Sequence, residues 1–201
     1  IKNLGPWVNL LNQIILKKFI TKCLLILNKL KLALITGASK GIGRSTAISF
    51  ANAGWDLILV SRNLELLEEL KAELSNTTSK INLINCDLSN KEDIKNSVNK
   101  LLEDYGCPSV LINNAGVAFN GNLVEMPLEE WQKIIQVNLT SVFQICSLIV
   151  PQMRKKGGLV INVSSHAAYN AFPQWGAYCV SKAALASFTK CLREEERCNS
   201  I

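Results

Sequence analysis

The chain has 201 residues, of which 48% are hydrophobic and 19% charged, a composition that suits one domain with a full core and excludes a disordered chain or a coiled coil. Its formal net charge of +6 belongs to residues 1–31, which hold six lysines and no acid, whereas residues 32–201 hold 16 basic and 16 acidic side chains. A neutral folded part argues against nucleic acid as a partner.

Cysteine and histidine usage bears on the compartment and on metals. The seven cysteines are scattered, odd in number and never spaced as CxxC. This pattern indicates a reducing compartment, and we expect a cytoplasmic protein. His166 is the single histidine, which excludes a multi-histidine centre, so we predict no metal site.

Residues 1–30 read as a basic amphipathic extension that precedes a domain predicted for residues 31–201. Apolar residues recur at helical spacing from Leu16 to Leu27, with lysines between them. The longest uncharged run, Asn3 to Leu16, has 14 residues and is too short to span a bilayer. Three alternatives remain open: a helix docked on the domain, an interfacial helix in peripheral membrane contact, and a poorly structured extension.

The first element of the domain is a strand that ends in a glycine-rich turn. Leu32 to Ile35 predicts a short buried strand, Thr36-Gly-Ala-Ser-Lys-Gly-Ile-Gly43 follows at once, and a helical pattern covers residues 45–53. Backbone N–H groups and the helix dipole at such a helix start favour a phosphate. Glycines let the backbone come close to it. We therefore interpret this stretch as a phosphate-binding loop.

Strands and helices then alternate. The pattern predicts strands at residues 55–60, 81–86 and 109–113 and helices at residues 64–74 and 91–105. This alternation predicts right-handed βαβ units, hence an α/β fold with a doubly wound parallel sheet covered by helices on both faces. Ligand sites in such sheets lie beyond the carboxyl ends of the strands, which makes the residues there the candidates for binding.

Two cations at this edge bear on the choice of dinucleotide. Ser61 and Arg62 follow the second strand, where a carboxylate would accept the free 2′-hydroxyl of NAD, whereas a 2′-phosphate favours cations. Arg62, together with Lys40 in the glycine loop, therefore favours NADP(H) over NAD(H).

The third and fourth strands end in further candidates. Asp87 can accept a hydrogen bond from an adenine amino group, or it can cap the following turn. In Asn113-Asn-Ala-Gly116 the small residues let the chain pass close to a ribose, and the same turn can stabilise the sheet.

The second half holds the candidates for chemistry. Residues 131–150 predict one long apolar helix with Asn138 inside it, although asparagine disfavours helix interiors. A strand at residues 159–163 delivers Ser164 and Ser165 to the same edge. Tyr178 and Lys182 are four residues apart and thus neighbours on one helix face, where a nearby ammonium favours the phenolate form of a tyrosine.

These motifs resemble the short-chain dehydrogenase/reductase family. Residues 36–43 match its TGxxxGxG loop and residues 113–116 its NNAG segment, and Tyr178-Cys-Val-Ser-Lys182 matches its YxxxK motif, 13 positions after Ser165. The resemblance runs from about residue 31 to the end and implies a Rossmann-like fold. It implies cofactor binding by Gly37, Ser39, Lys40, Gly41, Ile42, Gly43, Arg62, Asp87, Leu88, Asn114, Ala115, Gly116, Tyr178 and Lys182.

The resemblance also implies a mechanism. Hydride passes between the nicotinamide of NADP(H) and a small-molecule carbonyl or alcohol substrate, and Tyr178 is the general acid/base. Ser165 polarises the substrate oxygen. Lys182 binds the nicotinamide ribose, and Asn138 links Lys182 to solvent through a water held at a helix distortion.

Other functions remain as alternatives. A dinucleotide sensor would keep the fold without the chemistry, and a membrane-surface scaffold would use residues 1–31. The filling of all four catalytic positions favours the enzyme. A Ser-His hydrolase is disfavoured because His166 has no aspartate at triad spacing. Four residues between Ser165 and Tyr178 are expected to wall an apolar substrate pocket or to join the core: Tyr169, Ala171, Phe172 and Trp175.

The family pattern continues beyond residue 201 with two strands and a substrate loop. We therefore expect a C-terminally truncated enzyme that turns over weakly alone and has its fifth strand at an unpaired edge. The first residue is Ile, so the N-terminal end can also be incomplete. In the full-length form the helices at residues 131–150 and 182–196 are expected to form a homodimer or homotetramer face.

Overall fold

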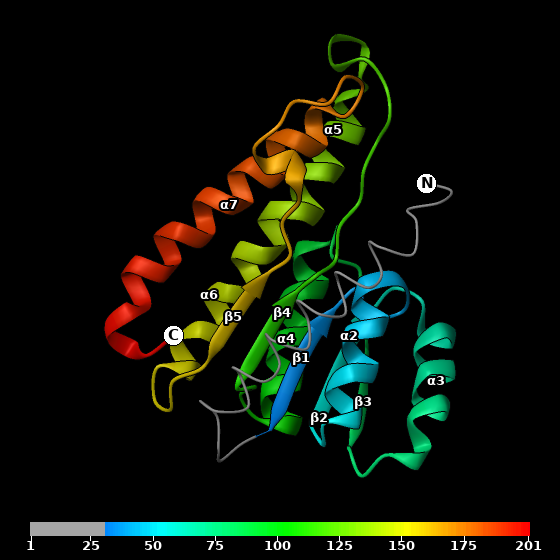
Figure 1. Ribbon diagram of the computed structural model, residues 1–201, viewed down its shortest axis with the longest axis vertical. Coiled ribbons are helices and arrows are strands. Elements are labelled where there is room, and N and C mark those ends of the chain that lie inside the picture. The colour runs from blue at the N-terminus through cyan, green and yellow to red at the C-terminus, as the bar shows by residue number, and fades with distance from the viewer. Residues whose placement is uncertain (1–30) are drawn as a thin grey trace.

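The computed structural model describes residues 31–201 (Figure 1). The N-terminal extension and its three alternatives lie outside the described residues.

A five-stranded parallel sheet forms the centre of the domain. Its strand order is β3-β2-β1-β4-β5, and every neighbouring pair is parallel. The order reverses at β1, which pairs with β2 on one side and β4 on the other, so a crevice opens beyond its carboxyl end. The strands are β1 Leu32–Thr36, β2 Asp56–Ser61, β3 Ile81–Asn85, β4 Val110–Asn113 and β5 Leu159–Asn162.

Helices cover both faces of this sheet (Figure 1). One face packs against α2 (Gly41–Asn52) and α3 (Leu64–Glu73) through a core centred on Phe50, Trp55 and Leu67. The opposite face packs against α4 (Lys91–Tyr105), α6 (Ser141–Met153) and α7 (Gly176–Glu196). The doubly wound, Rossmann-like α/β fold predicted from the sequence is confirmed.

The predicted element boundaries hold to within a few residues, with two informative exceptions, at α2 and at the helix predicted for residues 131–150. The helix expected at residues 45–53 begins at Gly41, so the last part of the glycine loop is the first turn of α2. Asn63 and Asn90 cap the N-termini of the next two helices. The side chain of Asn63 accepts a hydrogen bond from one backbone N–H of the first turn, and that of Asn90 accepts from two.

The helix predicted at residues 131–150 is longer and interrupted. It runs as α5 (Leu128–Ile135), a π-helical turn at Gln136–Thr140, and α6. By length and composition, residues 128–153 form a helix that could cross a membrane, but half of its apolar window is buried inside the protein. It is packed as a core helix, and the π turn marks a functional candidate.

The strand β5 lies at the edge of the sheet, and all four of its residues are partly exposed. After α7 the chain folds back toward the start of β5, where the N–H of Gly158 donates to the carbonyl of Ser200 over 3.1 Å. Glu196 is buried there and accepts two hydrogen bonds from Arg154, at 2.9 and 2.5 Å. These contacts attach the end of α7 to the end of α6.

Candidate active site

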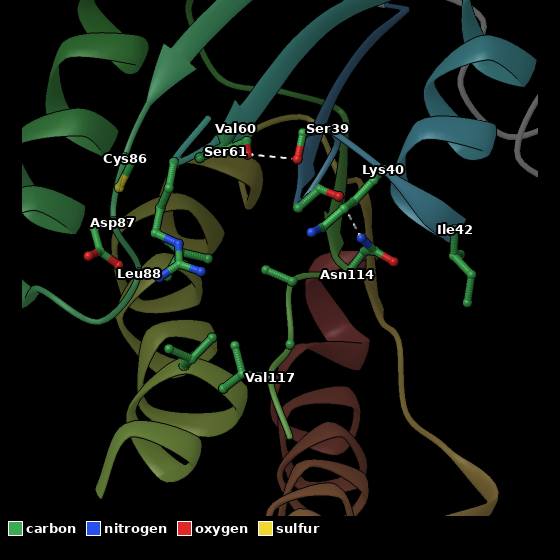
Figure 2. A pocket seen from close by; sticks show the side chains of 15 residues that line it. Ser39, Lys40, Ile42, Val60, Ser61, Cys86, Asp87, Leu88, Asn114 and Val117 are labelled. Atoms are coloured by element: carbon green, nitrogen blue, oxygen red, sulfur yellow. Dashed lines mark hydrogen bonds between the residues drawn. The ribbon is translucent and has the colours of Figure 1, made fainter. Parts of the chain in front are cut away.

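A cleft of about 270 Å³ opens at the carboxyl edge of the sheet, at the point where the strand order reverses. Figure 2 shows Ser39 and Lys40 on one side of it and Cys86, Asp87 and Leu88 on the other. Ten of the residues predicted to bind a cofactor line this cleft: Gly37, Ser39, Lys40, Ile42, Arg62, Asp87, Leu88, Asn114, Ala115 and Gly116. Gly41, Gly43, Tyr178 and Lys182 do not line it.

Two glycines shape the cleft through close backbone packing. Gly37 has φ +66°, and a Cβ there would lie 2.8 Å from the Cα of Ala115. At Gly43, inside α2, a Cβ would lie 2.3 Å from the carbonyl oxygen of Gly37 and 2.5 Å from Nδ2 of Asn114. Gly43 therefore lets the helix seat against the loop; the sequence predicted only cofactor contact for it.

Asn114 ties the end of β4 to the glycine loop. Its Nδ2 donates to the carbonyl oxygens of Thr36 (2.9 Å) and Gly37 (3.2 Å), and the backbone N–H groups of Asn114 and Ala115 donate to the Thr36 hydroxyl at 3.0 and 3.1 Å. The side chain of Asn114 thus has the sheet-stabilising role that the sequence left open, and Asn114 lines the cleft as well.

The charged side chains of the cleft follow three different strands: Lys40 follows β1, Arg62 follows β2 and Asp87 follows β3. The Ser61 hydroxyl donates to the Ser39 hydroxyl over 2.9 Å, which holds the end of β2 against the glycine loop that carries Lys40. Asp87 accepts a hydrogen bond from the Ser89 N–H at 2.9 Å, so it caps the following turn. Burial acts to raise the pKa of Asp87, but the bonds from Ser89 and the charge of Arg62 lower the pKa below its ordinary value. The cleft therefore keeps a carboxylate beside a guanidinium.

A second cavity, of about 190 Å³, brings together residues predicted for catalysis. Ser165 and Tyr178 both line it, with Ala167, Phe172 and Trp175. The Trp175 ring meets the Tyr178 ring edge-on, with centroids 6.0 Å apart. Trp175 and Phe172 therefore wall the pocket as expected, whereas Tyr169 and Ala171 are not among its lining residues and Tyr169 is 73% exposed.

Lys182 lies beside Tyr178 on the same face of α7. Its Nζ is 5.7 Å from the centre of the Tyr178 ring and donates to the carbonyl oxygen of Val163 over 2.7 Å. The side chain is buried, and this burial lowers the pKa of Lys182 to about 8. The ammonium form still predominates at neutral pH, so a positive charge stands next to the phenol.

Asn138 sits in the π turn, fully buried. Its Oδ1 accepts from the Val117 N–H (2.8 Å), and its Nδ2 donates to the Val117 carbonyl (2.9 Å) and to the Ser181 hydroxyl (3.0 Å). The helix distortion expected at Asn138 is present. Both N–H groups of its side chain, however, donate hydrogen bonds to protein atoms. Any water relay from Lys182 would therefore use the backbone of Asn138.

Sequence reasoning missed several residues of this site. Val60, Cys86, Val117 and Val137 line the cleft. Ser181 joins the π turn to α7, because it accepts from Asn138 and donates to the carbonyl of Tyr178 over 2.8 Å. Only the place of Ser181 between Tyr178 and Lys182 could have drawn attention to it.

Among residues 31–201, no group of three or more His, Cys, Asp or Glu side chains is placed to hold a metal ion. The ring of His166 contacts the amide of Asn170, and none of the carboxylates in this part of the chain is hydrogen-bonded to it. The geometry gives the Ser-His hydrolase alternative no support.

Comparison with known proteins agrees with this geometry. The family model described as short chain dehydrogenase matches residues 31–201. The chain belongs to the short-chain dehydrogenase family. It is 37% identical over 161 residues to a 3beta-hydroxysteroid dehydrogenase of Mediterraneibacter gnavus, covering 80% of this chain and 58% of the relative. This chain therefore spans little more than half the length of that relative.

Two other relatives extend the comparison. The 3-oxoacyl-[acyl-carrier-protein] reductase FabG of Thermotoga maritima is 35% identical over 166 residues, covering 82% of this chain and 68% of the reductase. A metagenomic short-chain oxidoreductase solved in complex with NADP superposes with a TM-score of 0.81 at 33% identity, covering 84% of this chain and 77% of that one.

Proposed function

We propose that this protein is an NADP(H)-dependent oxidoreductase that interconverts a small-molecule carbonyl compound and its alcohol. One observation carries the proposal: Ser165 and Tyr178 line one cavity while the ammonium of Lys182 stands 5.7 Å from the Tyr178 ring. A phenol beside a buried ammonium and a hydroxyl is the group set that proton transfer to a carbonyl oxygen requires.

The residues of the larger cleft fit a dinucleotide with a 2′-phosphate. Gly37 and Gly43 keep the loop backbone against the sheet where side chains would displace it, and the loop runs into the N-terminus of α2. Lys40 and Arg62 both line the cleft. These cations support NADP(H) over NAD(H). When bound, the cofactor supplies or accepts the hydride.

Four side chains have separate roles in the proposed reaction. The Ser165 hydroxyl accepts from the Ala167 N–H at 3.1 Å, which leaves its own hydrogen to donate to a substrate oxygen. Tyr178 transfers its proton to that oxygen in reduction and takes it back in oxidation. Lys182 stabilises the phenolate that results, and its N–H groups not used by Val163 can donate to the hydroxyls of a bound ribose. Asn138 holds Val117 and α7 in place around them.

The free cysteines bear on where the reaction takes place. All six cysteines in residues 31–201 are free. We propose a reducing, cytoplasmic setting for the enzyme.

The test is turnover of NADPH with a panel of ketones, followed by the absorbance of the reduced nicotinamide. Tyr178→Phe should lower kcat by about 10² to 10⁴, a much larger effect than any loss of NADPH affinity. Tyr105→Phe, at the exposed end of α4, is the matched control and should retain the wild-type rate. Equal rates for Tyr178→Phe and wild type would remove Tyr178 from the mechanism. NADPH binding without turnover of any ketone in the wild type would favour the sensor alternative.

A further inference from the structure

A series of hydrogen-bonded polar side chains joins β4, β5 and α7, and it reaches α7 seven residues after Lys182. Nδ2 of Asn113 donates to Oδ1 of Asn162 over 2.8 Å, and Nδ2 of Asn162 donates to the hydroxyl of Thr189 over 2.9 Å. The Thr189 hydroxyl donates to the carbonyl of Leu185 in its own helix over 2.7 Å. Asn113 is 2% exposed, and the other two side chains are half-buried.

The bonds in this series have mutually consistent directions. The hydrogen of the Thr189 hydroxyl is used within α7, so toward the strand that hydroxyl acts as an acceptor. Asn162 must then turn its NH₂ group to Thr189 and its oxygen to Asn113. Such an arrangement favours one position of α7 along β5, because a slide of one residue (about 1.5 Å) would lengthen, compress or misalign the 2.9 Å bond to Thr189.

A second contact between the same two elements involves Lys182. Its Nζ donates to the carbonyl of Val163, the residue directly after Asn162, and the N–H of Val163 donates to the carbonyl of Asn113 over 2.9 Å. Lys182 and Thr189 are seven residues apart, hence on the same face of α7 and about 10 Å apart along its axis. The face between them is packed into the core through Leu185.

The two contacts differ in how tightly they fix the helix. A lysine has a flexible four-carbon stem, which can follow its acceptor when the helix shifts. Asparagine and threonine have short side chains, so the bond between Asn162 and Thr189 tolerates little movement of the backbone.

We propose that Asn162 and Thr189 are positioning residues. Their hydrogen bond fixes the position of α7 along β5 and thereby keeps Nζ of Lys182 hydrogen-bonded to the Val163 carbonyl. The inference rests on the proposed function for its consequence in turnover. The position of the Lys182 side chain can be measured without enzyme turnover.

The experiment compares the reactivity of Lys182 in folded variants, measured by brief labelling with an amine-reactive acetylating reagent and peptide mass spectrometry. Thr189→Val keeps the shape of the side chain and removes the acceptor. Thr189→Ser keeps the hydroxyl. Thr46→Val is the matched control, because it removes a buried hydroxyl from α2, on the other side of the sheet. Thermal unfolding of each variant reports general stability.

The expected result is that the labelling rate of Lys182, extrapolated to the fully deprotonated amine from its pH dependence, rises at least about fivefold in Thr189→Val, because a displaced amine is more accessible to the reagent. Thr189→Ser and Thr46→Val should label like wild type. Asn162→Ala removes the same bond from the strand side and should act like Thr189→Val, which keeps the test decisive if Thr189→Val does not fold. Wild-type labelling in a folded Thr189→Val or Asn162→Ala would overturn the inference, as would an equal rise in Thr46→Val.

Turnover provides a second measurement. Displacement of a catalytic group by about 1 Å costs on the order of 10² in rate, so Thr189→Val should lower kcat by about tenfold to hundredfold. NADPH affinity should fall much less than kcat, because Lys40 and Arg62 line the larger cleft and stay in place while Lys182 loses only its contact to the ribose. If the wild type lacks turnover but labelling behaves as expected, the proposed function fails and the positioning role stands. If turnover is present and labelling is unchanged, the positioning role alone fails.

Discussion

Gly43 offers the sharpest test of how the cleft is built. In a Gly43→Ala variant the new Cβ would lie 2.3 Å from the carbonyl oxygen of Gly37 and 2.5 Å from Nδ2 of Asn114. A carbon and a carbonyl oxygen need about 3.3 Å, so the helix and the loop must separate by about 1 Å. The Asn114 amide cannot turn aside freely, because it donates to the carbonyls of Thr36 and Gly37.

The magnitude follows from these contacts. Overpacking at a rigid position costs about 1–3 kcal/mol, and a weakened Asn114 hydrogen bond adds about 1 kcal/mol. We therefore expect Gly43→Ala to lose about 2–4 kcal/mol of unfolding free energy, or about 4–16 °C in Tm for a chain of this length.

Gly41 supplies the matched control, two residues earlier. Its φ of +59° disfavours alanine, but a Cβ there would meet no atom within 4 Å. The strain of the left-handed conformation, about 1–2 kcal/mol, is partly offset because alanine restricts the unfolded chain. Gly41→Ala should lose about 1 kcal/mol. Urea unfolding of both variants measures the difference, and equal losses within about 0.5 kcal/mol would refute the packing role of Gly43.

Three further variants test other contacts. Asn138→Ala removes the side-chain partner of both the N–H and the C=O of the half-buried Val117, at about 1–3 kcal/mol each, so urea unfolding should show a loss of about 2–5 kcal/mol. A loss below about 1 kcal/mol would contradict a stabilising role for these two bonds. Arg62→Asp should weaken NADPH at least tenfold relative to NADH in fluorescence titrations, and an unchanged ratio would argue against a phosphate contact. The bond from Arg154 holds the pKa of Glu196 below its ordinary value of 4.5, so its stabilisation is present at neutral pH and is lost on acidification below about 4.5. The stability difference between wild type and Glu196→Gln should therefore shrink as the pH falls, and a constant difference would exclude the pair as its source.

Much of the architecture follows from local pattern. Apolar runs bounded by turn residues predict the five strands, and helical spacing predicts the helices between them, because burial repeats with the geometry of each element. The position of the cleft also follows, since the ends of parallel strands share one edge. The neighbouring positions of Tyr178 and Lys182 need only the helical repeat.

The division of roles among the site residues depends on contacts distant in sequence. Asn114 could serve a ribose, the sheet or both, and its bonds to Thr36 and Gly37, 78 and 77 residues away, establish the role in the sheet. Asp87 could serve adenine or a turn, and its bond to the N–H of Ser89 establishes the capping role. Neither choice is visible in the identity of the residue.

The sequence by itself determined the order of the elements, the glycine loop and the spacing of Ser165, Tyr178 and Lys182, because these depend on chain geometry over a few residues. Only the tertiary structure decided that Gly43 is a packing position, that Val117 and Ser181 hold the side chain of Asn138, and that Thr189 contacts Asn162. Each of these depends on which surfaces of distant elements approach within a few ångströms. That distance is set by the packing of the whole domain, and a local pattern of residue types does not encode it.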